Sequence, residues 1–227
     1  MEQKEADHMD QVFNQFSTLK AMVDMQAMSQ STSPISSMLT LGSPKLPYFL
    51  TVPGLGTALF SNESSSYIKI LPNPGGFPSN GLTITSVLYK SENSYFVDQE
   101  YALEGGGIII HQPNSDPVMR ADPSIAAVNG SSKIVVRFDL PVFVGMAGKT
   151  RTEGEGKCFI RTNYSSNQTY FTNIPAGGNI KIYTQYDIAW NQSLHNILGV
   201  YDRNGYLSIT RVSAQPTDYV QISPGTK

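Results

Sequence analysis

The longest helical pattern in the chain lies near its start. From Asp7 to Met28 the apolar side chains recur with the 3.6-residue period of one helix face, and neither Gly nor Pro interrupts the run. The apolar stripe, a candidate interaction surface, consists of Met9, Val12, Phe13, Phe16, Leu19 and Val23. Such a stripe has to be covered, and we expect it to pack on its own chain. The alternatives are pairing with other copies and continuation from a membrane helix.

A polar, Ser-rich segment follows the helical pattern. The run SQSTSPISS contains a proline and no apolar period, which is typical of a linker. We therefore expect an N-terminal amphipathic helix at 1–28 that acts as a stalk, a linker at 29–40 and a β-rich domain at 41–227.

The period changes to two after the linker. Tyr95–Leu103 alternates between two faces, and the run Glu104-Gly105-Gly106-Gly107 separates it from the apolar run Ile108–His111. Glycines adopt positive φ without steric cost, so these segments predict a hairpin. Similar short runs predict further strands at Tyr48–Val52, Thr57–Phe60, Tyr67–Leu71, Leu82–Tyr89, Lys133–Asp139, Val142–Val144, Cys158–Asn163, Thr169–Asn173, Ile180–Ile188 and Tyr219–Ile222.

Two features are predicted near the C-terminus. The spacing of apolar residues in Trp190–Leu198 predicts a short helix, and Asn204-Gly205 predicts a hairpin turn joining Gly199–Tyr201 to Tyr206–Val212. The whole pattern predicts a mainly β fold, an antiparallel β-sandwich or jelly-roll-like domain with one N-terminal helix and a short helix near Trp190.

Composition supports an exported β protein. Of the 227 residues 40% are hydrophobic and only 15% charged, below the usual value of about 25%, while Gly, Pro and Tyr are frequent. The net charge is −2 and the basic residues are scattered, so we expect no nucleic-acid partner. No run of about 18 apolar residues is present, and five of the first ten residues are charged, so we expect the chain as given to be soluble and without a signal peptide.

No catalytic group stands out in the sequence. Asp98 and Glu100 would lie about 7 Å apart on one strand face, a separation that suits a glycosidase, but alternating charge on a strand is also ordinary surface. Asn114, Asp116 and Asp122 offer weak calcium ligands, and the lone Cys158 has no evident partner. We expect no enzyme, no cofactor and no metal.

Five Asn-X-Ser/Thr sequons are candidate glycosylation sites. Most fall in expected loops or turns, where a glycan could attach in an exported chain. They begin at Asn62, Asn129, Asn163, Asn167 and Asn191.

One segment resembles a known group of proteins. Ser86–Gln112, with its Tyr-Phe-Val-Asp-Gln strand and Glu-Gly-Gly turn, is similar to ectodomain segments of uncharacterised archaeal membrane-anchored proteins with a type IV pilin-like N-terminus. The similarity continues weakly at Val118-Met119 and Pro123-Ser124-Ile125, resumes at Tyr186–Trp190 with the short helix and in the closing hairpin, and so covers most of Leu41–Ile222. It implies a transmembrane or pilin-type helix ahead of Asp7, which this sequence lacks, and it supplies no catalytic residues.

Three hypotheses for function remain. The first is a non-enzymatic extracellular domain of an archaeal pilin-like surface protein, membrane-anchored when full-length, with a structural or interaction role. Its partners would be further copies or other pilin-like subunits, contacted through the N-terminal helix. The second is a glycan-binding module of the cell envelope, which a row of exposed Tyr or Trp across a sheet would favour. The third is a glycan-acting enzyme, which requires two convergent carboxylates in a cleft.

Overall fold

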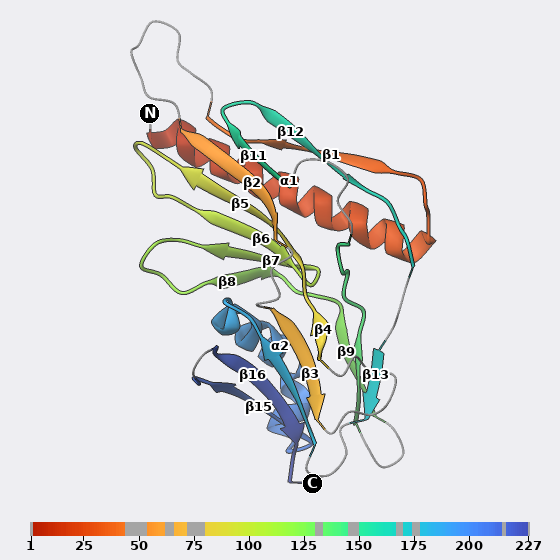
Figure 1. Ribbon diagram of the computed structural model, residues 1–227. Coiled ribbons are helices and arrows are strands. Elements are labelled where there is room, and N and C mark those ends of the chain that lie inside the picture. Colours follow the sequence, from red (N-terminus) through yellow and green to blue (C-terminus); the bar gives the residue numbers. More distant parts are fainter. Residues whose placement is uncertain are drawn as a thin grey trace, which may run out of the picture.

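The computed structural model describes residues 2–43, 54–61, 66–71, 80–129, 134–144, 150–166, 170–173, 178–214 and 217–226. These residues form a mainly β, sandwich-like structure with antiparallel sheets and two helices (Figure 1). In chain order the elements are α1 (Glu2–Ser29), β1 (Ile35–Thr40), β2 (Leu55–Ser61), β3 (Tyr67–Leu71), β4 (Leu82–Thr83), β5 (Ser86–Glu92), β6 (Glu100–Glu104), β7 (Gly107–His111), β8 (Val118–Ala121), β9 (Ile125–Asn129), β10 (Ile134–Phe138), β11 (Arg151–Gly154), β12 (Lys157–Thr162), β13 (Tyr170–Asn173), β14 (Asn179–Tyr183), α2 (Asp187–Arg203), β15 (Leu207–Val212) and β16 (Tyr219–Pro224).

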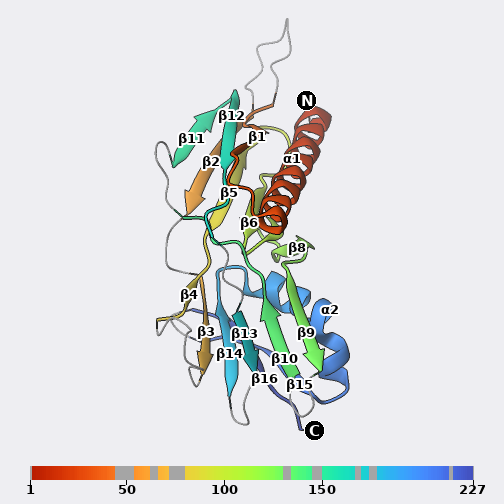
Figure 2. The same ribbon diagram turned by 90° about the vertical axis from the view of Figure 1, so that its right-hand side faces the viewer.

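The described strands pair in four sheets. A six-stranded sheet has the order β11-β2-β5-β6-β7-β8, and a five-stranded sheet has the order β15-β16-β14-β3-β4. The smaller sheets are β13-β10-β9 and β1-β12. Helix α1 lies along the six-stranded sheet and α2 lies beside the five-stranded sheet; both helices lie on the same side of the molecule, opposite β3 and β4 (Figure 2).

The six-stranded sheet separates two hydrophobic cores. Val87 and Leu103 face the core beneath α1, which also holds Met9, Val12, Phe16 and Leu19. The alternate residues Leu88, Ala102 and Ile109 face the second core, which contains Trp190 of α2 and the inward side chains of the five-stranded sheet. Because successive side chains of a strand point to opposite faces, β5, β6 and β7 join the two cores.

The N-terminal helix packs on its own chain. Val12 and Phe16 are fully buried, Met9, Leu19 and Val23 nearly so, and Phe13 is half-buried against the same core. The position of α1 differs from that of a projecting stalk, because its apolar stripe is covered by the six-stranded sheet and β1. The segment 29–40 also differs from the predicted linker: Ile35–Thr40 forms β1, which pairs with β12 and buries Leu39 under α1.

The predicted hairpin is present, but its first strand is shorter than expected. Strand β6 begins only at Glu100, because the backbone N–H groups of residues 94–96 bind a side chain of α1 instead of a neighbouring strand. Strands β6 and β7 then pair antiparallel around Gly105 (φ +54°) and Gly106 (φ +80°). Positive φ at both central residues is the type I′ arrangement that a two-residue hairpin favours.

The predicted hairpin at Asn204-Gly205 is wrong. Residues 199–203 belong to α2, which extends to Arg203, and Gly205 (φ +73°) follows the helix end. The Tyr206 N–H donates to Tyr201 O and the Gly205 N–H donates to Asp202 O, both at 2.9 Å, which is the Schellman pattern. An Asn-Gly pair suits a helix C-terminus as well as a hairpin turn, since both need positive φ. The sequence pattern alone did not distinguish them.

Other strand predictions differ at particular places. Strand β14 ends at Tyr183 rather than at residue 188, and residues 142–144 form no strand. Strands β8, β9 and β11 were not predicted as strands. The strand expected at Tyr48–Val52 lies outside the described residues.

Candidate functional site

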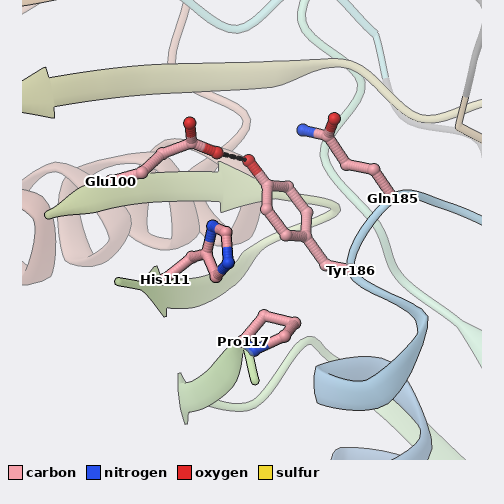
Figure 3. Close-up of a pocket in the computed structure, with 5 residues that line it drawn as sticks. All are labelled: Glu100, His111, Pro117, Gln185 and Tyr186. Atoms are coloured by element: carbon pink, nitrogen blue, oxygen red, sulfur yellow. Dashed lines mark hydrogen bonds between the residues drawn. The ribbon is translucent and has the colours of Figure 1, made fainter. Parts of the chain in front are cut away.

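A shallow pocket opens where the six-stranded sheet meets the segment before α2. It has a volume of about 190 Å³. Its lining comprises Glu100 of β6, His111 of β7, Pro117, and Gln185 and Tyr186 (Figure 3). Glu100 and His111 are paired residues of adjacent strands, so the hairpin around Gly105-Gly106 places them side by side. The close-up shows Tyr186 reaching from the start of α2 toward the Glu100 carboxylate.

The Glu100 carboxylate is already partnered from two sides. The Tyr186 hydroxyl donates a hydrogen bond to Glu100 Oε1, and Lys90 Nζ lies 2.6 Å from Glu100 Oε2. Burial, followed by the negative charge of Glu100, raises the pKa of Tyr186 well above its ordinary value of 10. Tyr186 therefore stays protonated and serves as a hydrogen-bond donor, not as a base.

The expected carboxylate pair does not converge in this pocket. Asp98 lies outside β6, and its Oδ1 accepts the Asn93 N–H at 2.6 Å within the preceding loop. Glu100 is the only carboxylate among the described residues that line the pocket. The volume is also below the roughly 300–1,000 Å³ of ordinary ligand pockets. The arrangement can hold a small polar group, but it lacks the two-carboxylate geometry of a glycosidase.

Glu104 lies deeper, two side chains further along the same face of β6. It is almost fully buried and accepts hydrogen bonds from Trp190 Nε1 (2.9 Å) and the hydroxyls of Thr184 (2.6 Å) and Ser66 (3.1 Å). Burial raises the pKa of Glu104 from its ordinary value of 4.5, and the three hydrogen bonds act in the opposite direction. Through these hydrogen bonds Glu104 joins β6 to α2 and to the segment before β3. Because solvent does not reach its carboxyl group, we assign Glu104 a structural role.

A row of tyrosines crosses the outward face of the five-stranded sheet. Tyr183 of β14 is paired with Tyr67 of β3 on one side and with Tyr219 of β16 on the other. The Tyr67 and Tyr183 rings are stacked with centroids 4.5 Å apart, and the Tyr183 and Tyr219 rings are 4.9 Å apart. All three side chains are partly exposed. The signal in the sequence is the doubled Ile-Lys-Ile motif at 68–70 and 180–182, since these two segments pair in register.

Two lysines form the next row on this face. Lys69 and Lys181 are paired across β3 and β14. Lys181 Nζ lies 4.6 Å from the Tyr219 ring centroid and 3.3 Å from the Tyr219 hydroxyl, while Lys69 is in no ion pair among the described residues. Strand alternation and register place the following residues outward: Thr83, Tyr67, Lys69, Leu71, Asn179, Lys181, Tyr183, Tyr219, Gln221, Ser223, Ser208, Thr210 and Val212. None of these described residues carries a carboxylate.

Buried polar side chains fix α1 to the β structure at both ends. The Glu5 carboxylate accepts the backbone N–H groups of Ser94 (3.0 Å), Tyr95 (2.7 Å) and Phe96 (2.7 Å). At the other end Gln26 donates to Thr162 O at 3.0 Å and accepts from the Thr162 hydroxyl at 2.7 Å. Because these bonds lie near both ends of α1, they fix the position of the helix relative to the strands along the helix axis.

His8 lies in this interface one helical turn after Glu5. Its Nε2 lies 3.2 Å from the Tyr89 hydroxyl and 3.4 Å from Leu41 O, and the Tyr89 hydroxyl donates to Leu41 O at 2.6 Å. Its Nδ1 is buried without a hydrogen-bond partner among the described residues. Burial lowers the pKa of His8 from 6.5, so the imidazole is neutral in the folded protein near neutral pH.

The sequons lie in different surroundings. Asn163 is exposed in the segment after β12, whereas Asn191 lies in α2, half-buried, with its Oδ1 enclosed and unpartnered among the described residues. Asn129 ends β9. Asn62 and Asn167 lie outside the described residues. Of the described sequons, Asn163 has the geometry that suits glycan attachment best.

The weak calcium candidates do not form a cluster. Asp122 accepts the Ser193 hydroxyl at 2.6 Å, while Asn114 and Asp116 are exposed in the loop between β7 and β8. No group of three or more His, Cys, Asp or Glu side chains among the described residues is placed to hold a metal. Cys158 is half-buried beside the α1 core.

The fold and the pocket define a class in structural terms. The chain is a mainly β, sandwich-like protein with antiparallel sheets, in which α1 and α2 contribute to the cores on opposite faces of the six-stranded sheet. Comparison with known protein families, curated proteins and solved structures finds no match. In the part of the chain that the structure describes, neither helix combines the length and apolarity needed to cross a membrane.

Proposed function

We propose that this chain is the non-enzymatic extracellular domain of an archaeal pilin-like surface protein, with a structural or interaction role. A membrane anchor on the N-terminal side is part of the same proposal and rests on the resemblance of residues 86–112. In this role one face of α1 packs on the β structure and the opposite face contacts other subunits.

The packing of α1 is the observation that carries the proposal. The 28-residue helix buries one face on the β structure and is held by Glu5 and Gln26. Its opposite face is exposed along the whole length, and it ends in the apolar pair Met25 and Met28, which are 54% and 86% exposed. A rigid helix with one docked face and one free face suits a subunit that is displayed and contacted laterally.

Light scattering over a concentration series tests the contact role. The molar mass of the chain should rise with concentration, and Met25→Glu/Met28→Glu should suppress the rise because it places charge in the apolar contact. Val200→Glu is the matched control, since Val200 is 58% exposed on α2. Constant monomeric mass, or equal suppression by the control, would rule out contact through this end of α1.

Surface labelling tests the location separately. Antibodies against the chain should label intact cells of the source organism as strongly as permeabilised cells. Labelling that requires permeabilisation would refute the surface location, whatever the association behaviour.

Glycan binding is the second candidate function. The row formed by Tyr67, Tyr183 and Tyr219 across the five-stranded sheet favours it, because partly exposed aromatic side chains aligned on a sheet can line a polysaccharide site. Titration with envelope polysaccharides of the source organism tests it; absence of binding to all of them would refute it.

A further inference from the structure

We propose that the outward face of the five-stranded sheet binds an acidic polysaccharide, one whose sugar units carry carboxylates. The site consists of the hydroxyl groups of the tyrosine row and the ammonium groups of Lys69 and Lys181. The inference rests on the glycan-binding candidate and narrows its ligand from glycans in general to uronate-bearing chains.

The ring geometry does not favour the usual way of holding a neutral sugar, stacking on an aromatic face, at the centre of the row. Apolar stacking of a sugar needs a free aromatic face, but Tyr183 has Tyr67 against one face and Tyr219 near the other. Lys181 lies over the Tyr219 ring. Tyr183, at the centre of the row, therefore has no free face for stacking, and its hydroxyl group is left to donate a hydrogen bond to an oxygen atom of a ligand.

The charge of the face complements carboxylates. Lys69 and Lys181 lie side by side, and no carboxylate occurs among the described outward residues of this sheet. Charge-assisted hydrogen bonds from ammonium to carboxylate are stronger than neutral ones. The whole chain has a net charge of −2, so its overall charge does not attract a polyanion. Binding of a polyanion would therefore depend on a local basic face such as this one.

The lysine row continues into neutral hydrogen-bonding groups on the next two strands. Gln221 continues the lysine row on β16, and Thr210 continues it on β15. These groups suit the hydroxyls of successive sugar units. Strands in a sheet are about 4.8 Å apart, so the described rows extend across several strands, a span that a linear polysaccharide can follow.

Affinity electrophoresis and calorimetry in calcium-free buffer, with polygalacturonate as the probe and dextran as the neutral comparison, test the proposal. We expect the chain to bind polygalacturonate, to bind more weakly as salt is added, and to ignore dextran. Lys69→Gln/Lys181→Gln should weaken binding about tenfold. Tyr183→Phe, which keeps the stacked ring and removes its hydroxyl, should weaken binding by a smaller factor.

Lys4→Gln/Lys157→Gln is the matched control, because it also removes two charges, from exposed lysines on α1 and β12 that lie outside this sheet. Its affinity should equal that of the unmodified chain, and thermal unfolding should show every variant folded. No binding of polygalacturonate, or an equal loss in the control, overturns the proposal. Equal binding of dextran overturns the acidic preference while leaving the glycan-binding candidate in place.

Discussion

Trp190 donates its indole N–H to Glu104 Oε1 at 2.9 Å, and both side chains are almost fully buried. The bond joins α2 to β6, the strand whose two faces contribute to the two hydrophobic cores. A carboxyl group in this position is neutralised more easily than in water, because burial disfavours its charged form.

Glu104→Gln should remove a pH dependence of stability. The raised pKa of Glu104 means that the folded state keeps a proton after the unfolded state has lost it, so its contribution is complete below pH 4.5 and is lost as pH rises through the folded pKa. Urea unfolding from pH 4 to pH 8 should show the variant gaining stability relative to the unmodified chain as pH rises. Glu153→Gln, at an exposed position, is the comparison.

His8→Gln should have the opposite effect on acid stability. Burial lowers the pKa of His8, so the unfolded state takes up a proton first as pH falls below 6.5, and the native state loses stability through that range. The variant should lose less stability than the unmodified chain between pH 7 and pH 5. His195→Gln, at an exposed position of α2, is the comparison. If the stability of His8→Gln falls with pH as steeply as that of the unmodified chain, His8 is not a buried neutral group.

Glu5→Ala should detach the start of α1 from the loop before β6. Hydrogen bonds to a charged group are worth about 1.5–3 kcal/mol each, and water replaces part of the loss at this partly exposed loop, so we expect a net loss of about 3 kcal/mol. Thermal unfolding and hydrogen exchange at Tyr95 and Phe96 measure it. Glu2→Ala, exposed in the same helical turn, should change neither quantity.

Phe16→Ala should destabilise the protein by about 3–5 kcal/mol, because it leaves a cavity in the core beneath α1. Chemical denaturation is the measurement. Phe13→Ala should lower the free energy of unfolding by less, because Phe13 is only half-buried. Met28→Ala should stay within about 0.5 kcal/mol of the unmodified chain. A neutral result for Phe16→Ala would mean that α1 does not dock in solution.

Gly105→Ala should cost about 1–3 kcal/mol. Its φ is +54°, which side chains disfavour, and a Cβ there would lie 3.1 Å from the Trp190 ring. Gly156→Ala is the matched control, since a Cβ at that position meets nothing within 4 Å. Chemical denaturation of the two variants should differ by the cost of the turn.

Much of the fold was predictable where a pattern has one physical outcome. An uninterrupted 3.6-residue period of apolar side chains predicted α1, and Gly105-Gly106 between apolar runs predicted the turn from β6 to β7. At Asn204-Gly205 a residue with positive φ is compatible with either a hairpin turn or the end of a helix. Because α2 extends to Arg203, Gly205 ends that helix. The segment Tyr95–Gln99 alternates like a strand, but the N–H groups of Tyr95 and Phe96 donate to Glu5 and that of Gln99 donates to Ser91 Oγ.

The candidate site was predictable only in part. Glu100 stood out as a carboxylate on a strand, whereas its partners Tyr186 and Lys90 come from separate elements that no local spacing connects. The tyrosine row likewise depends on the pairing of β3, β14 and β16, which are more than a hundred residues apart at the extremes.

The sequence by itself determined the mainly β class, the amphipathic helix and the tight Gly turn, because each follows from local period and backbone freedom. Only the tertiary structure decided that α1 docks on its own sheet, that the segment after it becomes β1, and that Lys69 and Lys181 share one face. Those outcomes depend on which distant segments pair in which register, and hydrogen bonds between remote strands leave no periodic trace in the chain.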